Sequence, residues 1–265
     1  MYSTVELSLK YIRYFLTASN GKGHGIHSPF VYQFVTQVLN KNNTPSNVDA
    51  IENRRALLKT NKSVIDIVDL GAGSRQSVNK KRAIGEIAKN ALKQKKMSQL
   101  LYRMGVYFKP SHILEMGTSL GITSSYLAMS MPDSQFVTME GSASIAQEAM
   151  TTFKQLNLKN VIIKEGDFLA NLPSYLNSIS SVGMVYIDGN HRYIPTMQYF
   201  NLLLEKVNEH SILIFDDIYW SAEMELAWEE IKKNDAVTLT IDLFHIGIVF
   251  FRKENKQKEH FTIRY

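Results

Sequence analysis

The sequence contains no cysteine, which excludes disulfide bonds, thiolate nucleophiles and cysteine-ligated zinc. It also has no run of eighteen apolar residues, the length that one membrane-spanning helix needs. Within the first twenty residues, Glu6, Lys10 and Arg13 interrupt the apolar stretch that a signal peptide requires. Internal repeats and low-complexity segments are missing as well. These absences predict a cytoplasmic protein that does not enter the membrane.

The 265 residues, of which 45% are hydrophobic, suffice to bury a large core. The net charge is +5, and it is unevenly distributed. The segment from Arg75 to Arg103 contains nine lysines and arginines but only one acidic residue, Glu86. Such a segment either attracts an acidic ligand or forms the solvated face of a helix, which the apolar spacing at positions 84, 87, 88 and 91 favours. No aromatic residue lies between positions 80 and 96, which disfavours nucleic-acid binding.

Two hydrophobic patterns divide the chain near residue 110. Before it the spacing is helical, with one apolar face formed by Val5, Leu9, Ile12 and Leu16. Further helices are expected from Ser28-Pro29 onward and around 48–58, because proline is favoured in the first helical turn. After residue 110, short apolar runs alternate with amphipathic helical segments, which is typical of βαβ units. We therefore expect a mainly helical N-terminal extension in residues 1–109 and a separate domain in 110–265.

The expected strands of this domain are the apolar runs 112–116, 135–140, 160–165, 182–188 and 211–216. Helices are expected between them near 121–131, 143–156, 169–178 and 194–207, and a last one near 221–233. The runs 237–244 and 246–252 are too close for the crossover that parallel strands need, so they must pair antiparallel. The predicted fold is α/β and Rossmann-like: a doubly wound, mainly parallel sheet of seven strands that ends in an antiparallel hairpin.

The segment Ile113–Gly121 reads as a strand that turns through glycines into a helix. Gly117 and Gly121 let the backbone approach a ligand, and Thr118 and Ser119 lie between them. The helix N-terminus offers free N–H groups to a carboxylate. A tight turn in which the glycines serve only packing is the alternative.

Acidic residues follow the next three expected strands. Glu140 stands 23 residues after Gly117, where a carboxylate can accept both hydroxyls of a ribose. The carboxylate of Asp167 could accept a hydrogen bond from the amino group of an adenine, while the ring of Phe168 lies on the base. Asp188 ends the fourth run. Any one of these acids could instead cap a helix. Together with the turn after 112–116, they favour a ligand site at the carboxyl edge of the sheet.

Residues 112–252 resemble the class I methyltransferases that depend on S-adenosylmethionine (SAM). The stretches ILEMGTSLGITSSYLA and VYIDGNHRY are similar to the branch that methylates oxygen atoms of small molecules. The resemblance implies a SAM site formed by Glu115, Gly117, Thr118, Ser119, Gly121, Glu140, Asp167, Phe168 and Asp188. Residues 1–109 resemble the helical N-terminal extension of uncharacterised relatives, and this resemblance says nothing about an activity. Asp69–Ser74 (DLGAGS) also looks like a SAM motif, but basic helical sequence follows it, so we interpret it as a loop of the extension.

Two catalytic arrangements are open. Asp188, Asp216 and Asp217 resemble the ligand positions of metal-dependent, catechol-type O-methyltransferases, which implies Mg²⁺ or another divalent cation. The sequence departs from that pattern, with Asp217 in place of an asparagine and His191 in place of a lysine, and Asp217 could instead cap a helix. In the second arrangement His191 is the general base beside Asp188, although a histidine there could only stiffen the turn.

We therefore expect a SAM-dependent methyltransferase that acts on a small molecule, with oxygen as the acceptor atom. The Asn/Asp-Pro-Pro-Tyr motif of amino-methylating nucleic-acid enzymes is missing after 182–188, which argues against nucleic acid as a partner. Tyr193 and Trp220 could wall an aromatic acceptor pocket or belong to the core. Two alternatives stay open: a nicotinamide-dependent oxidoreductase, disfavoured by the missing G-x-G-x-x-G, and a SAM-binding protein without turnover. A homodimer is also left open.

Overall fold

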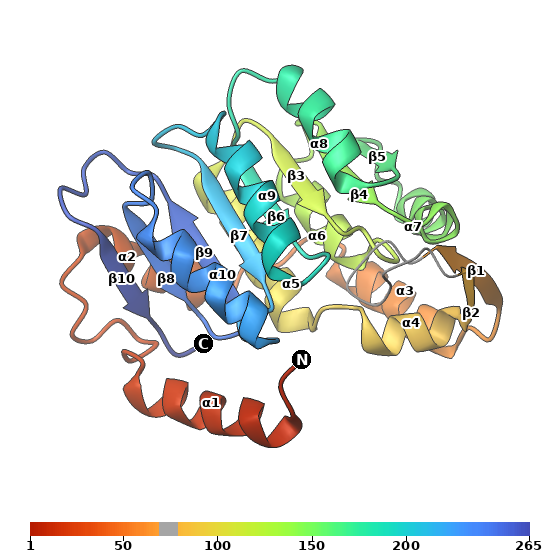
Figure 1. Ribbon diagram of the computed structural model, residues 1–265. Helices are drawn as coiled ribbons and strands as arrows, with labels where there is room; N and C mark the ends of the chain where they lie inside the picture. The colour runs from red at the N-terminus through yellow and green to blue at the C-terminus, as the bar shows by residue number, and fades with distance from the viewer. Residues whose placement is uncertain (69–78) are drawn as a thin grey trace. The chain divides into compact units, whose positions relative to one another are not determined.

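The computed structural model describes residues 1–68 and 79–265, and the chain divides into two compact units (Figure 1). Unit 1 comprises Met1–Lys41 and Leu172–Tyr265, and unit 2 comprises Asn42–Asn171. Helix α8, Phe168–Asn177, contains the point where the chain passes from unit 2 to unit 1. The domain boundary expected between residues 109 and 110 is a different division of the chain and stays a prediction.

Unit 1 contains a five-stranded sheet. Its helical elements are α1 (Thr4–Thr17), α2 (Pro29–Phe34) with a following π-helical turn (Val35–Leu39), α9 (Tyr193–Leu204) and α10 (Ala222–Lys233). Its strands are β6 (Met184–Ile187), β7 (Ile212–Asp216), β8 (Leu239–Asp242), β9 (Ile246–Phe250) and β10 (Glu259–Thr262). The strand order is β10-β8-β9-β7-β6; β6 pairs parallel with β7, β9 pairs antiparallel with both β7 and β8, and β10 pairs parallel with β8.

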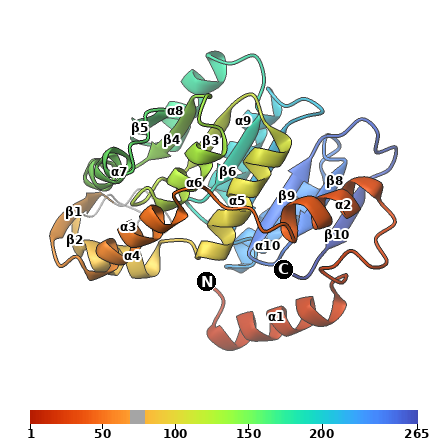
Figure 2. The same ribbon diagram turned by 180° about the vertical axis from the view of Figure 1, so that it is seen from behind.

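The two faces of this sheet are covered by different helices. Phe250 on β9 contacts Phe30 of α2, with ring centroids 5.1 Å apart. Phe215 on β7 contacts Phe200 of α9 and Trp228 of α10 at 6.1 and 6.5 Å. Phe250 lies opposite Ile212 in the register of β9 and β7, and therefore on the same face as Ile212. Phe215 is three residues after Ile212, and successive residues of a strand alternate between faces, so the two sets of contacts lie on opposite sides of the sheet. Figure 1 accordingly shows α9 and α10 over one face, and Figure 2 shows α2 over the other.

Unit 2 contains three parallel strands and a separate hairpin. Its helices are α3 (Val48–Thr60), α4 (Ile84–Asn90), α5 (Lys95–Phe108), α6 (Ile122–Ser130) and α7 (Ala143–Gln155). Its strands are β1 (Val64–Val68), β2 (Asn79–Ala83), β3 (Ile113–Met116), β4 (Phe136–Glu140) and β5 (Val161–Glu165). The sheet order is β3-β4-β5, all parallel, and β1 pairs antiparallel with β2. The carboxyl ends of β3, β4 and β5 therefore meet at one edge of the unit 2 sheet.

Small residues permit close helix packing in unit 2. A Cβ atom added to Gly105 of α5 would lie 2.0 Å from Oγ of Ser130 at the end of α6, so any larger residue at this position would separate the two helices. A buried cluster that includes Ile51, Leu58 and Tyr126 joins α3 to α6. Helix α6, which begins directly after the glycine turn, is thus packed against α5 and α3.

The Rossmann-like fold and the antiparallel hairpin, β8–β9, are confirmed. Strands β3 to β10 number eight in the described residues, one more than expected. The additional strand is β10, whose sequence Glu-His-Phe-Thr has too few apolar residues to indicate a strand; it forms because β8 offers it an edge.

One expectation for the first hundred residues was wrong. Lys81 and Arg82 do not lie on a helix but on β2, which pairs with β1, and helical structure begins only at Ile84. Helix α1 forms as predicted, yet its apolar face is exposed, with Val5 69% and Leu16 71% accessible. Among the described helices, none is both long enough and apolar enough to cross a bilayer.

Candidate active site

The chain leaves β3 through a turn that favours glycine. Gly117 has a φ of 112° and Gly121 a φ of 79°, which is the left-handed region that other residues rarely adopt. The N–H groups of Gly117 and Thr118 donate to the carbonyl oxygen of Met139, at 3.0 and 3.2 Å, and tie the turn to β4. Helix α6 begins directly after Gly121. A helix N-terminus placed behind a glycine turn is an arrangement that binds carboxylates and phosphates.

Glu115 holds this turn together from inside the unit. Its side chain is fully buried on β3, and its Oε2 accepts hydrogen bonds from the hydroxyls of Ser124 on α6 and Thr138 on β4, the latter at 2.7 Å. The hydroxyl oxygens of Thr138 and Thr118 lie 2.6 Å apart. Glu115 therefore links β3, β4 and α6, and its expected role as a direct cofactor ligand stays a prediction.

Glu140 is oriented by two backbone groups at the end of β4. Its Oε2 accepts from the N–H of Ser119, at 2.9 Å, and its Oε1 accepts from the N–H of Ser142, at 3.0 Å. Burial raises the pKa of this carboxyl, and the backbone hydrogen bonds from Ser142, Ser119 and Gly141 offset only part of the effect. Each carboxylate oxygen has a second lone pair, so the group can still accept hydrogen bonds from a ligand.

Asp167 caps a helix. Its Oδ1 accepts from the backbone N–H of Ala170, at 3.1 Å, and the side chain is exposed. Phe168, the first residue of α8, is partly buried. The capping alternative named for this acid is therefore what the geometry shows, and contacts of Asp167 and Phe168 with an adenine stay a prediction.

In unit 1, two carboxylates and an imidazole converge at the ends of β6 and β7. Asp188, His191 and Asp216, here called the Asp/His cluster, each offer one ligand atom, and these atoms lie within 4.8 Å of one another. Asp188 accepts a hydrogen bond from the hydroxyl of Tyr186 at 3.0 Å, and its Oδ1 lies 3.5 Å from Nε2 of His191. Asp216 is fully buried as the last residue of β7. This donor set suits a divalent cation.

Asp217, expected as a metal ligand, is not part of the Asp/His cluster. It has a left-handed φ of 52°, and its N–H donates to the carbonyl oxygen of His245 at 2.7 Å. Instead, Asp217 and Trp220 line a cavity beside α1. Tyr193, the other expected wall residue, donates from its hydroxyl to Glu230 on α10, at 2.5 Å. The SAM-like motif Asp69–Ser74 lies outside the described residues.

Sequence reasoning missed the side chains that position the site residues. Thr138 and Ser124 hold Glu115, and Tyr186 holds Asp188. The only sequence signal was indirect, since polar residues stood inside apolar strand and helix patterns. A buried polar side chain needs a hydrogen-bond partner, so these positions could have been marked as hydrogen-bonded. The sequence could not have identified the partner of each one.

Residues 114–218 match the family model described as a methyltransferase domain. This segment of the chain is therefore similar to a methyltransferase domain. Solved structures similar to the chain carry related names: the O-methyltransferase TomG from Streptomyces achromogenes is 20% identical, with a TM-score of 0.54 over 62% of this chain and 82% of the other. A Podospora anserina methyltransferase is 13% identical, with a TM-score of 0.60 over 85% of this chain and 97% of the other. A Bacillus cereus O-methyltransferase is 18% identical, with a TM-score of 0.55 over 83% of this chain and 97% of the other.

At these identities the solved structures establish the fold of the chain and no more. A comparison with curated proteins finds no match to the chain. The fold expected from the sequence is confirmed, and the match of residues 114–218 agrees with the expected resemblance to methyltransferases.

Proposed function

We propose that the protein transfers the methyl group of SAM to an oxygen atom of a small molecule. The observation that carries the proposal is Glu140, whose two oxygens are oriented by backbone N–H groups beside the glycine turn after β3. A carboxylate at the end of the second strand of such a unit can accept both hydroxyls of a ribose. The solved structures support this cofactor, because TomG was crystallised with SAM and the B. cereus O-methyltransferase with S-adenosylhomocysteine.

In this proposal the site residues have different roles. Gly117, Thr118, Ser119 and Gly121 face the amino-acid part of SAM, where the N-terminus of α6 offers N–H groups to its carboxylate. Glu140 binds the ribose, and Asp167 and Phe168 bind the adenine. Glu115 fixes the turn, and Asp188 helps to orient the cofactor or the acceptor.

Methyl transfer from a sulfonium is an in-line displacement, so the protein must align the acceptor oxygen, exclude water and accept a proton. His191 is suited to accept that proton, because an imidazole can act as a general base and the Asp188 carboxylate, 3.5 Å from its Nε2, can fix the orientation of the ring. Alternatively, Asp188, His191 and Asp216 hold a divalent cation, which when bound lowers the pKa of the acceptor hydroxyl. A neutral imidazole has one acceptor nitrogen, so a His191 that binds a cation with it cannot also accept the proton of the acceptor, and its two roles are exclusive.

Calorimetric titration with SAM tests the cofactor assignment. Glu140→Gln removes charged hydrogen bonds to the ribose and should weaken SAM binding about 10- to 100-fold. Glu165→Gln is the matched control, because Glu165 pairs with Glu140 in the sheet register, ends the neighbouring strand and is exposed. Equal affinities for the two variants would contradict the proposal.

Turnover separates the remaining alternatives. Transfer of labelled methyl from SAM to hydroxylated small molecules supports the enzyme, whereas SAM binding with no acceptor turned over supports a protein without catalysis. Heat from NAD and none from SAM supports an oxidoreductase. Activity that chelation abolishes and Mg²⁺ or Mn²⁺ restores assigns His191 to the cation; activity that survives chelation assigns it to the proton. A homodimer and a cytoplasmic location stay predictions.

A further inference from the structure

Helix α1 carries apolar side chains on two opposite faces. One face is covered, because Tyr14 and Ala18 are buried in a cluster with Phe244 from the loop between β8 and β9. The opposite face consists of four exposed residues, here called the outer row: Val5, Leu9, Ile12 and Leu16. Residues three and four positions apart are neighbours on a helix, so the outer row is a continuous apolar strip about three turns long. A strip of this kind is typical of a surface that binds a partner.

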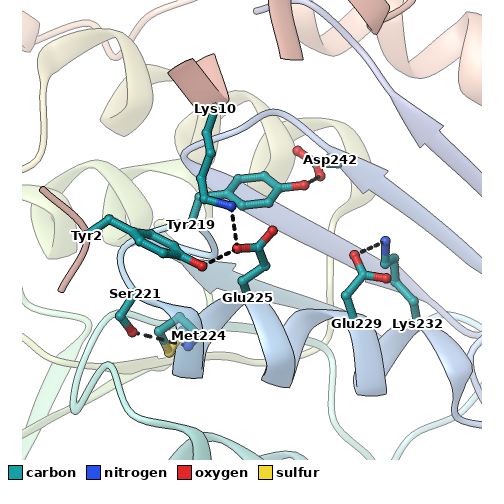
Figure 3. A network of polar contacts seen from close by, with 9 residues as sticks. All are labelled: Tyr2, Lys10, Tyr219, Ser221, Met224, Glu225, Glu229, Lys232 and Asp242. Atoms are coloured by element: carbon teal, nitrogen blue, oxygen red, sulfur yellow. Dashed lines mark hydrogen bonds and ion pairs between the residues drawn. The ribbon is translucent and has the colours of Figure 1, made fainter. Parts of the chain in front are cut away.

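The contacts of the covered face hold α1 in this orientation. Near the start of the helix, Glu225 of α10 accepts hydrogen bonds from the hydroxyl of Tyr2, at 2.6 Å, and from Nζ of Lys10, at 2.7 Å (Figure 3). Near its end, the hydroxyl of Tyr14 donates to the carbonyl oxygen of Ile263 at 2.5 Å. Because both ends of the helix are attached, α1 cannot rotate to bury the outer row without breaking these bonds.

The spacing of the outer row is that of a helix that packs against a second helix. Its members follow one another by four, three and four positions, which are the a and d positions of a heptad repeat. Leu9 and Leu16 then occupy a positions, and Val5 and Ile12 occupy d positions. The outer row therefore favours a helical partner whose apolar side chains have the same spacing, and α1 of a second copy is such a helix.

The charges beside the outer row match those of a second α1 in the antiparallel direction. Glu6 and Arg13 are exposed and lie on the same flank of the outer row, one heptad apart. In an antiparallel pair the same flanks of the two helices meet, so Glu6 of each copy lies beside Arg13 of the other. The hydrogen bonds that Glu6 accepts from Ser3 use Oε2, so Oε1 can accept from that arginine. In a parallel pair this flank would instead meet Ser8 and Phe15, which offer no opposite charge.

The same flank disfavours a membrane surface as the partner. Helices that lie in a membrane interface are rich in lysine and arginine beside their apolar face. Here the flank carries an acid, Glu6, and the charge of Lys10 is paired with Glu225 at 2.7 Å.

We propose that the outer row is the interface of a homodimer in which two α1 helices pack antiparallel about a two-fold axis. In this pairing Val5 packs against Leu16 of the second copy, and Leu9 packs against Ile12. A two-fold contact buries the same strip on both copies. With four apolar side chains from each copy the interface is small, so we expect the dimer to exchange with monomer at micromolar concentrations. The pairing does not depend on the proposed methyl transfer.

Sedimentation equilibrium of the full chain tests the interface. Leu9→Glu places a charge in the outer row, and Leu57→Glu on α3 is the matched control, because both leucines are 62% accessible. We expect Leu9→Glu to weaken the dimer at least tenfold and Leu57→Glu to leave it within twofold. An unmodified protein that stays monomeric at millimolar concentration, or equal effects of the two substitutions, would overturn the proposal.

Disulfide cross-linking tests the antiparallel direction. The chain contains no cysteine, so an introduced cysteine is the only thiol. When Val5→Cys and Leu16→Cys proteins are mixed and oxidised, we expect the link between the two variants to form at least tenfold more than the link of either variant to itself. Leu57→Cys should not cross-link. A dominant link of Val5→Cys to itself would show a parallel pair and refute the antiparallel dimer.

Vesicles of phosphatidylcholine and phosphatidylserine test the membrane as the alternative occupant. Cosedimentation of the unmodified protein with these vesicles, lost in Leu9→Glu and retained in Leu57→Glu, would assign the outer row to a membrane surface and overturn the dimer. Absence of the protein from the vesicle pellet, together with a dimer that Leu9→Glu weakens, is the result we expect.

Discussion

Gly121, at the start of α6, combines two demands that alanine cannot meet. Its φ is 79°, and a Cβ atom added there would lie 2.8 Å from Cε1 of Phe153 and 3.3 Å from Cα of Ala149 on α7. The nearer atom belongs to a ring and the farther one to a helix backbone, so relief requires α7 or the Phe153 ring to move. Gly121→Ala should therefore destabilise unit 2 and shift the turn that carries Thr118 and Ser119.

The expected loss is the sum of two terms. A left-handed conformation costs a residue with a Cβ about 1–2 kcal/mol. Forcing an extra carbon into a packed contact costs about 1–3 kcal/mol. We expect Gly121→Ala to lower the free energy of unfolding by about 2–5 kcal/mol and the melting temperature by about 4–15 °C.

Gly25→Ala separates the two terms. Gly25 has nearly the same φ, 80°, but no heavy atom lies within 4 Å of the Cβ position. It should show the conformational cost alone, about 1–2 kcal/mol or less, because alanine also reduces the entropy of the unfolded chain. Urea and thermal unfolding of both variants measure the difference. A loss in Gly121→Ala no larger than in Gly25→Ala would refute the packing argument.

Three further outcomes are expected. SAM affinity, measured by calorimetry between pH 4.5 and 7.5, should fall as the pH is lowered, because burial raises the pKa of Glu140 and only its ionised form accepts both ribose hydroxyls; a flat profile would contradict this. Lys10→Met should lower stability by at most about 1 kcal/mol, because its ion pair with Glu225 is partly exposed. Burial raises the pKa of Glu225, but the hydrogen bonds from Lys10 and Tyr2 and the charges of Lys10 and Arg13 together lower it below its usual range. The loss in Lys10→Met should therefore vanish as acid protonates Glu225, and it should shrink in 1 M salt. Asp216→Ala should abolish saturable Mn²⁺ binding while Asp217→Ala preserves it, and the opposite order would disprove the Asp/His cluster as the cation site.

Local patterns were sufficient for most of the elements in residues 110–265. Strands β3 to β7 and helices α6 to α10 lie within a few residues of the predicted runs, because the period of apolar residues reflects whether one face of a helix or a strand is buried. The pattern failed where burial came from elsewhere. Strand β10 exists because β8 presents an open edge, and the apolar face of α1 is exposed although its spacing suggests a core helix.

The Asp/His cluster shows the same limit at the level of side chains. The sequence placed Asp188, His191, Asp216 and Asp217 after two neighbouring strands, but it could not say which of them meet. His191 joins Asp188 because the turn after β6 brings its Nε2 within 3.5 Å of Oδ1. Asp217 is kept out of the cluster by its left-handed backbone, which a hydrogen bond to His245 secures.

By itself, the sequence determined the α/β class, the order of the elements and the glycine turn, since apolar period and the backbone freedom of glycine are properties of residues and their close neighbours. Only the tertiary structure decided which acids converge, which aromatic residues line the cavity beside α1 and which face of α1 is covered. Those outcomes depend on bonds such as that from Asp217 to His245 or from Tyr2 to Glu225, whose partners lie far apart in the chain. No local pattern encodes such a pairing, because it exists only after the elements have packed.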